Sequence, residues 1–399
     1  MVILAEGSDF ERGLSVGRHA RKYIHLNLVN FAALCRAAGF SWNRLSEDAD
    51  MVSRGGLLPE SMQNYLRGMS EGASIPYRRL VAYNLFHNSL LPEECTVLIA
   101  MGDSTKNGNT IMLKNSDKIG SEKLVGDRYH SYKEVNVVVA EKPDDGHAFI
   151  AVAAAGEISI KMGLNDKGVA TGSNISRTWE LRQRKVDLTG LRALDRGWLM
   201  REGISKNPSA QSAASTALNH LLSNPMSTPG NIEFVDAGEA IVIEGSYDRL
   251  AVQKTSDGVI ARSNRFNVLE SLNDPEDVSS YARYVRAMQL LNSNRKQITS
   301  EMMTVFSQDH VNGPGPNSIC RHSPDFREET SLSAAVMEIN RSNARRSTIH
   351  VCLGKPCYAW KSEKGHILLD FYSVEEGLPR EFTSGEAFKT HYTEKPFET

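Results

Sequence analysis

The feature that most constrains the fold is the occurrence of strand-like segments in three groups, with helical segments between the groups. The first group reads CTVLIAM, NTIMLKN, KEVNVVVAE, HAFIAVAAA, GEISIKMGLN and GVATGSN; the second reads NIEFVDAGEAIVIEGS and RLAVQKTSDGVIARSN; the third reads SLSAAVMEIN, RSTIHVCLG and HILLDFYS. Turn sequences such as TKNGN and PDDG separate neighbouring runs and are typical of hairpins. Hairpins inside groups and helices between them predict an α+β fold, with stacked antiparallel sheets covered by helices.

In the remaining segments, apolar residues recur at the spacing of helices. LTGLRALDRGWLMREGI and SAQSAASTALNHLLSN follow the first strand group, and SSYARYVRAMQLLNS and SEMMTVFSQDH follow the second. Residues 1–94 are predicted to be mainly helical: ERGLSVGRHARKYIHLNLVNFAALCRAAG has helical spacing, and in LPESMQNYLRGMSEGASI, Pro59 and Gly72 mark a start and a stop. No repeat or linker divides the chain into independent domains.

Charge and cysteine content exclude several classes of protein. Among 399 residues, 46 basic and 48 acidic side chains give a net charge of −2, so no nucleic-acid partner is expected. No apolar run reaches the roughly 18 residues that a membrane span needs. MVILAEGSDFERG lacks the basic and long apolar segments of a signal peptide. Five cysteines are too few and odd in number for a disulfide framework, so we expect a cytoplasmic protein of a reducing compartment.

Common cofactor and metal signatures are missing from the sequence. It has no glycine-rich phosphate loop, dinucleotide fingerprint or H-E-x-x-H, so no cofactor is expected. ICRH contains Cys320 and His322, and VCLGKPC contains Cys352 and Cys357, but neither spacing has the matching second pair of a zinc site. We therefore predict no metal site. His310 or His322 could instead pair with a cysteine nucleophile.

Polar residues lie at the ends of several predicted strands. In PEECTVL, Cys95 opens a strand directly after two acids, and Asp117 ends the hairpin that Cys95 begins, so both are expected at one edge of a sheet. Asn174 and Asn264 end later strands, and Arg283 follows in a helical segment. Taken singly, these residues are explained by turn preferences or by a solvated helix face.

Taken together, the same residues resemble the N-terminal-nucleophile hydrolases of the acyl-coenzyme A:6-aminopenicillanate acyltransferase family, relatives of choloylglycine hydrolases and penicillin V acylases. The similar stretches are CTVLIA…NGNTIMLKNSD, GLNDKGVATGSN, ARSNRF, ICRH and LGKPC, which span most of the chain. The resemblance implies a four-layer αββα sandwich and self-cleavage between Glu94 and Cys95. A helical propiece (residues 1–94) and a catalytic chain (residues 95–399) would then stay associated.

The resemblance also implies roles for the polar residues. A thiol needs its proton removed, and the freed α-amino group of Cys95, with an ordinary pKa of about 7.7–8.0, could accept it without a histidine. Asp117 would orient the new amino group and the thiol, and Arg283 would complete the charge network. Asn174 and Asn264 would supply oxyanion donors.

The sequence departs from the family pattern at several positions. Glu94 stands where glycine is common, Lys114 where relatives carry arginine, Ser116 where the acyltransferase has tryptophan, and Arg265 where histidine is usual. These differences leave the substrate open. The basic loop SRTWELRQRK, with Arg177, Arg182, Arg184 and Lys185, is interpreted as a solvated loop, although it could also meet a carboxylate or a CoA phosphate.

Several functions remain open at this point. The first is hydrolysis of a linear non-peptide amide through a Cys95 thioester. The alternatives are acyl transfer from an acyl-CoA to an amine, a dormant precursor that stays uncut, and a Cys-His enzyme that uses His310 or His322. The expected partner is therefore a small amide or acyl-CoA, and self-association into a homo-oligomer stays open.

Overall fold

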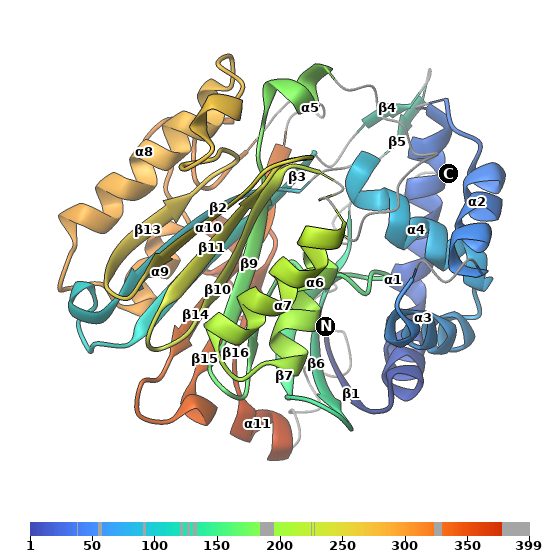
Figure 1. Ribbon diagram of the computed structural model, residues 1–399, viewed down its shortest axis with the longest axis horizontal. Coiled ribbons are helices and arrows are strands. Elements are labelled where there is room, and N and C mark those ends of the chain that lie inside the picture. Colours follow the sequence, from blue (N-terminus) through green and yellow to red (C-terminus); the bar gives the residue numbers. More distant parts are fainter. Residues whose placement is uncertain are drawn as a thin grey trace.

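Two stacked β-sheets form the centre of the computed structural model, and helices cover both outer faces (Figure 1). The structure describes residues 1–37, 39–54, 58–90, 93–119, 123–125, 128–130, 134–183, 195–224, 226, 228–322 and 329–376. The first sheet has the order β1 (Val2–Gly7), β6 (Asn136–Pro143), β7 (Phe149–Ala154), β8 (Met162–Asn165), β9 (Ala170–Ile175), β10 (Gly230–Val235), β11 (Ala240–Gly245) and β12 (Leu250–Thr255). The second has the order β13 (Gly258–Arg262), β2 (Glu94–Met101), β3 (Thr110–Ile119), β14 (Glu329–Ile339), β15 (Thr348–Leu353) and β16 (His366–Asp370).

The helices form the two outer layers. On the first sheet lie α1 (Asp9–Ala37), α2 (Trp42–Arg54), α3 (Glu60–Ala73), α4 (Tyr77–Leu90), α6 (Arg196–Lys206) and α7 (Ala210–Ser223); on the second lie α8 (Val278–Ser293) and α9 (Ser300–Phe306). Shorter elements are α5 (Trp179–Gln183), α10 (Pro356–Ala359), α11 (Phe371–Glu376) and the hairpin β4 (Lys123–Val125) to β5 (Arg128–His130). This arrangement confirms the predicted α+β class and its four layers, α, β, β and α.

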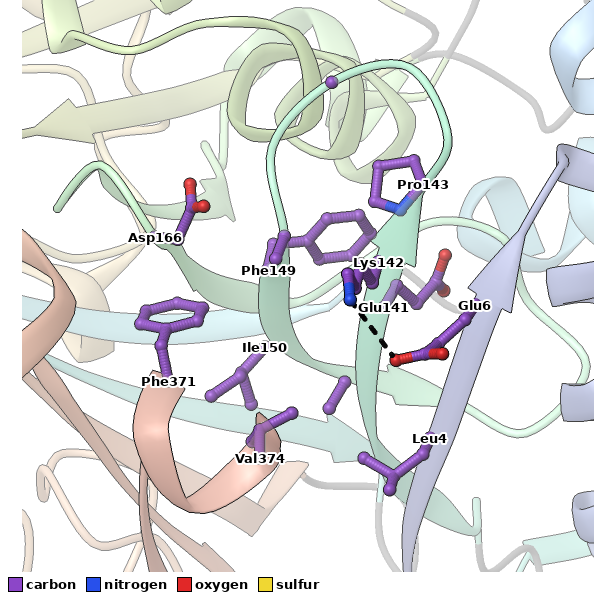
Figure 2. Close-up of a pocket in the computed structure, with 13 residues that line it drawn as sticks. Leu4, Glu6, Glu141, Lys142, Pro143, Phe149, Ile150, Asp166, Phe371 and Val374 are labelled. Atoms are coloured by element: carbon purple, nitrogen blue, oxygen red, sulfur yellow. Dashed lines mark ion pairs between the residues drawn. The ribbon is translucent and has the colours of Figure 1, made fainter. Parts of the chain in front are cut away.

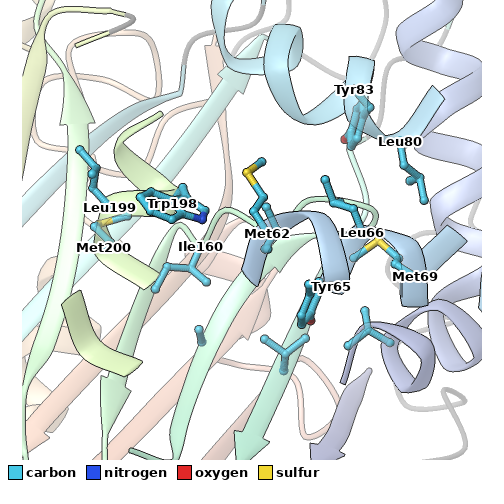
Figure 3. Packing of buried hydrophobic residues seen from close by; sticks show 14 of the residues in the cluster. Met62, Tyr65, Leu66, Met69, Leu80, Tyr83, Ile160, Trp198, Leu199 and Met200 are labelled. Carbon is cyan, nitrogen blue, oxygen red and sulfur yellow. The ribbon is translucent and has the colours of Figure 1, made fainter. Parts of the chain in front are cut away.

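The three largest of the four apolar clusters hold these layers together. Helices α1, α3 and α4 pack on the first sheet. Figure 3 shows Met62 of α3 near Ile160 and Trp198, with Tyr83 of α4 farther along the same cluster. A second cluster fills the space between the sheets, and a third lies between the second sheet and helices α8 and α9. Residues 1–94 are therefore part of one continuous core, with burial of apolar side chains as the main source of their attachment.

The first strand was not expected from the sequence. Residues 1–94 are mainly helical as predicted, but Val2–Gly7 forms β1 and pairs in parallel with β6 at the edge of an otherwise antiparallel sheet. GEISIKMGLN also contains less strand than expected, since only Met162–Asn165 forms β8. The segment before it is held by α4 instead, because Asn84 Nδ2 donates to Gly156 O at 2.8 Å.

Glycines let α1 and α3 approach closely. A Cβ atom added at Gly13 would lie 2.0 Å from the backbone oxygen of Tyr65, and one added at Gly68 would lie 2.0 Å from that of Phe10. Gly72 lies near the end of α3, as predicted, and also belongs to this contact, because a Cβ atom there would lie 2.4 Å from the backbone oxygen of Leu14. Helix α3 ends at Ala73, followed by Ser74 in the left-handed region with φ of 55°. None of the described helices combines the length and apolar character that crossing a membrane requires.

Candidate active site

Cys95 lies at the start of β2, beside the strand that carries Asp117. In the antiparallel register, Glu94 is opposite Asp117 and Cys95 is opposite Ser116, so the hairpin brings both ends to one edge of the second sheet. The Cys95 side chain is fully buried and forms no disulfide. The strand itself begins one residue earlier than predicted, at Glu94.

Asn264 and Arg283 converge on the backbone of Cys95. The Cys95 N–H donates to Asn264 Oδ1 at 3.3 Å, and the Arg283 guanidinium donates to Cys95 O at 2.9 Å. Arg283 also donates to Asn264 Oδ1 at 2.7 Å and to Thr96 Oγ1 at 3.0 Å. Helix α8 supplies Arg283, and Asp277 caps that helix by accepting from Ser280 N at 3.1 Å. Both polar groups of the Cys95 backbone are thus bound by side chains that follow β13.

The thiol of Cys95 faces the carboxylate of Glu93. The distance from Cys95 Sγ to Glu93 Oε1 is 3.3 Å, with the thiol as donor. Lys114 Nζ lies 2.9 Å from the same oxygen, and Lys161 Nζ contacts Glu93 Oε2. Burial raises the pKa of Cys95 well above its ordinary value; Lys114 opposes this rise, while Glu93 and Asp117 add to it. The uncut chain therefore keeps its thiol protonated.

The pKa of Glu93 is set by burial and by its cationic neighbours, and the neighbours together have the larger effect. Burial alone would raise the Glu93 pKa, whereas Lys114 and Lys161 hold that pKa well below its ordinary value. Lys161 lies 2.8 Å from a second buried acid, Glu134. Glu93 is thus a permanent anion beside the thiol, placed to accept its hydrogen bond.

Glu94 lies in a separate, arginine-rich environment. Arg177 and Arg321 both pair with its carboxylate, and Arg283 lies 3.8 Å from Glu94 Oε2. Burial favours the protonated acid, but Arg321, Arg177 and Arg283 hold the pKa of Glu94 below its ordinary range. The two acids that precede Cys95 therefore point to different sets of cations.

Asp117 is buried close to the same arginines. Ser331 Oγ donates to Asp117 Oδ1 at 2.6 Å, and Arg321 lies 3.9 Å from Asp117 Oδ2. A register shift between Ser331 and Ser333 in β14 places the serine against this carboxylate, as β-bulges commonly re-aim side chains. Burial raises the pKa of Asp117 to about 6, despite the opposing effect of Arg321 and Arg283. Among the described residues, Asp117 Oδ2 accepts no hydrogen bond.

The two predicted oxyanion residues each use one amide N–H for a backbone carbonyl. Asn174, near the end of β9, donates to Ser263 O, and Asn264 donates to Ile175 O at 2.8 Å. These bonds link the end of β9 to the segment after β13, so both side chains lie where the two sheets meet beside Cys95. Each side-chain NH₂ group keeps one further N–H.

Three groups of this site were missed by sequence reasoning. Glu93 was noted only as an acid, Lys161 carried no signal at all, and Arg321 was visible only as part of ICRH. The segment SRTWELRQRK was interpreted as a solvated loop. Arg177 does not fit that interpretation, because it pairs with the buried Glu94. Arg182 fits it, because this exposed side chain pairs with Asp274 and Glu276. Arg184 and Lys185 lie outside the described residues.

Cys95 lines none of four pockets formed by described residues. A cavity of about 180 Å³ lies between the first sheet and α11, where Figure 2 shows Phe149, Ile150, Phe371 and Val374; no predicted catalytic residue lines it. A second pocket of about 20 Å³, enough for one water, is lined by Glu93 together with Lys161, Ser173, Arg196 and Thr228. Glu93 thus contacts both this pocket and the buried thiol.

His310 and His322 do not contact Cys95 in the part of the chain that the structure describes. His322 Nε2 lies 3.0 Å from Cys357 Sγ and 3.6 Å from Cys320 Sγ, and the His310 ring packs against His322. No contact in this part of the chain therefore supports the alternative in which His310 or His322 activates Cys95.

Comparisons with known proteins give structural likeness only. No protein-family model matches the chain, and no curated protein matches it. Similar solved structures include the penicillin V acylase from Agrobacterium tumefaciens (13% identity, 65% of this chain, 83% of that chain, TM-score 0.38). A second is a Caenorhabditis elegans ortholog of N-acylethanolamine-hydrolyzing acid amidase (12% identity, 61% of this chain, 92% of that chain, TM-score 0.38). A third is a mutant of conjugated bile acid hydrolase from Clostridium perfringens (13% identity, 70% of this chain, 93% of that chain, TM-score 0.41). The sequence resemblance named two of these kinds of protein, the penicillin V acylases and the choloylglycine (bile acid) hydrolases. Likeness at this level establishes neither an activity nor a substrate.

Proposed function

We propose that the chain is a self-processing cysteine hydrolase that cleaves a linear, non-peptide amide through a thioester on Cys95. The convergence of Asn264 and Arg283 on the backbone N–H and C=O of Cys95 supports this most strongly. Any buried backbone N–H needs a hydrogen-bond partner, and in a strand that partner is usually a backbone carbonyl. At Cys95 the partner is the Asn264 side chain, which would remain in place to bind the α-amine once the chain is cut.

Self-cleavage would begin with attack of Cys95 Sγ on the carbonyl carbon of Glu94. The C–N bond between Glu94 and Cys95 breaks, the thiol proton passes to the leaving nitrogen, and a thioester joins Glu94 to the sulfur. Glu93 accepts the thiol hydrogen bond in the uncut chain and would orient the thiol. Water then hydrolyses the thioester, which leaves a carboxylate on Glu94 and a free thiol and α-amine on Cys95.

Turnover would use the amine that this cleavage creates. The amine takes the thiol proton, the sulfur attacks the substrate carbonyl, and the remaining N–H groups of Asn174 and Asn264 bind the developing oxyanion. The leaving amine receives the proton back, and water releases the acyl group as an acid. Asn264 Oδ1 and the unoccupied Asp117 Oδ2 would accept hydrogen bonds from the Cys95 ammonium group.

Packing would keep the two products of self-cleavage together. Strand β1 pairs with β6 along its whole length, and the helices of residues 1–94 share the largest apolar cluster with the first sheet. The cut between Glu94 and Cys95 therefore need not release residues 1–94.

The residue before the cut indicates which acyl groups to test first. Glu94 supplies the acyl group of the self-cleavage step, and its side-chain carboxylate pairs with Arg177 and Arg321. Once Glu94 moves away, these arginines suit an acyl group that ends in a carboxylate. Glutaryl anilide should therefore be cleaved faster than the neutral valeryl anilide of the same chain length.

The deciding experiment is intact-mass analysis and N-terminal sequencing of the purified protein. We expect two fragments, one of which begins at Cys95, and an uncut Cys95→Ala variant. Cys35→Ser removes a buried cysteine elsewhere and should be cut like the wild type. An intact wild-type chain with full amidase activity would exclude this mechanism.

The two other functions predict different results. An acyltransferase would transfer acyl groups from acyl-CoA to an amine faster than it hydrolyses amides. A dormant precursor, which the buried thiol and the arginine-bound Glu94 would suit, would stay intact and resist a thiol-reactive β-lactone.

A further inference from the structure

A second set of chemically capable side chains lies apart from the Cys95 backbone contacts. His310, Cys320, His322 and Cys357 each direct one nitrogen or sulfur ligand atom toward the others, and all four atoms lie within 4.8 Å of one another. The set contains two thiols and two imidazoles, which is a common ligand set of structural zinc sites. We propose that these four residues form a zinc-binding site.

The distances fit tetrahedral coordination. With Zn–S bonds of about 2.3 Å and Zn–N bonds of about 2.0–2.1 Å, tetrahedral geometry places neighbouring ligand atoms about 3.3–3.8 Å apart. His322 Nε2 lies 3.6 Å from Cys320 Sγ and 3.0 Å from Cys357 Sγ. Because the widest separation in the set is within 4.8 Å, side-chain adjustments of about 1 Å would complete the tetrahedron.

His310 provides an independent indication of a missing partner. Its Nε2 atom is buried, and it has no hydrogen-bond partner among the described residues. Its ring centroid lies 4.8 Å from that of His322 in an edge-on arrangement. A buried imidazole nitrogen without a partner is unfavourable, and a bound cation would remove the penalty.

The backbone fixes three of the four ligands before any metal binds. Cys320 N donates to Asp309 O at 3.1 Å, and His322 N donates to Pro314 O at 2.9 Å, so the loop from Asp309 to His322 folds back on itself. His310 therefore meets Cys320 and His322 although they are distant in sequence. Such a pre-formed loop lowers the entropy lost when a metal binds.

The fourth ligand comes from the segment after β15. Cys357 lies in the short helix α10, directly after Pro356, and the residue is 7% exposed. Gly354 has a φ of 120°, a conformation that suits glycine, and this turn leads the chain from β15 into α10. A pocket lined by His310, His322 and Cys357 gives a cation access from solvent.

Four protein ligands would leave no open position, as in structural rather than catalytic zinc sites. The expected role is to join the 309–322 loop to α10. Arg321, which pairs with Glu94, lies between two of the ligands.

Metal content of the full-length protein tests the proposal directly. The protein should be expressed with zinc and without a histidine tag, then passed through a metal-free column and analysed by plasma mass spectrometry. We expect about one zinc per chain in the wild type and less than about a tenth of that in Cys320→Ser/Cys357→Ser. Two controls should keep the metal: Cys35→Ser, and His350→Gln, which changes a histidine that pairs with His366 at 2.9 Å.

Cobalt binding to the wild type keeps the test valid if a variant does not fold. Protein stripped of zinc should bind one Co²⁺ with tetrahedral ligand-field bands and a thiolate-to-cobalt charge-transfer band, and zinc should displace it. An octahedral spectrum, zinc content below about a tenth per chain after reconstitution, or equal zinc in the ligand variants would overturn the proposal. A Cys320–Cys357 disulfide in protein purified under reducing conditions would do the same.

Discussion

The two cysteine clusters of this protein differ in what surrounds the sulfur. At Cys95, the neighbours are charged: Glu93 accepts from the thiol, and Arg283 binds the backbone carbonyl. Cys320 and Cys357 instead share the His322 imidazole as a neighbour, 3.6 Å and 3.0 Å from their sulfur atoms. Buried thiols alone thus indicate little about function. Bound backbone atoms suit a nucleophile that will become a chain end, whereas converging nitrogen and sulfur lone pairs suit a metal.

The largest effect should come from exchanging the nucleophile. Cys95→Ala should lower amide turnover to the uncatalysed background, because no thioester can form. Cys357→Ser removes a sulfur from the other cluster and should keep the nucleophile intact. Turnover of a chromogenic anilide, measured beside the intact mass of each protein, checks both expectations.

Comparable loss of activity in both cysteine variants would remove the distinction between the two clusters. The far-ultraviolet circular dichroism and melting temperature of each variant must therefore be measured first. Only variants that melt cooperatively should be compared.

Asn174→Ala should have the next largest effect. Loss of one good oxyanion donor lowers the rate by roughly a hundred- to a thousand-fold, or about 2.7–4 kcal/mol of transition-state stabilisation. We expect kcat to fall by that factor in protein that is already cut, with a small change in KM. A normal kcat in folded Asn174→Ala protein would remove this residue from the site.

Asp117 should make stability depend on pH in the opposite sense to an ordinary paired carboxylate. Burial raises its folded pKa from 3.8 to about 6, so the folded chain holds a proton that the unfolded chain has lost between these values. Stability should therefore fall as pH rises through this window, by up to about 3 kcal/mol. Urea unfolding of uncut Cys95→Ala protein at pH 4 and pH 6.5 measures this decline.

Asp117→Asn in the Cys95→Ala background should reduce that decline, because the amide does not titrate. Asp248→Asn changes a mostly exposed carboxylate and should leave the decline as in the parent. An equal decline in all three proteins would assign the pH dependence to other groups.

Local signals explain why much of the fold could be predicted. Alternating apolar residues and turn dipeptides act over a few positions, so β2, β3, β10 and β11 follow from the sequence alone. The hairpin register then places Asp117 at the same edge as Cys95. Strand β1 escaped prediction because six residues before a long helix carry little periodic signal, and its pairing with β6 is supplied by tertiary structure.

Contacts between distant side chains required the structure. Lys161 reaches Glu93 from the segment before β8, and no spacing in the sequence links the two. The predicted absence of a metal site rested on the spacing within ICRH and within VCLGKPC. That reasoning examined each stretch separately, whereas loop folding and strand pairing bring Cys320, His322 and Cys357 together with His310.

The smallest effect on turnover should come from the histidines of the second cluster. His310→Ala and His322→Ala should each remove most of the zinc but change amide turnover by less than about threefold, under 1 kcal/mol. Arg321 keeps its place without the metal, because its N–H donates to Ser331 Oγ at 2.9 Å and its C=O accepts from Ser331 N at 3.1 Å. Steady-state kinetics and metal analysis of the same samples give both numbers.

These histidine variants distinguish the two ways in which a thiol can be activated. If the α-amine of Cys95 accepts the thiol proton, no imidazole takes part, and turnover survives without zinc. If a histidine does so, His310→Ala or His322→Ala abolishes turnover while N-terminal sequencing still finds the same chain ends as in the wild type. Because His322 lies 3.0 Å from Cys357, that second result would also make Cys357 the nucleophile to test next.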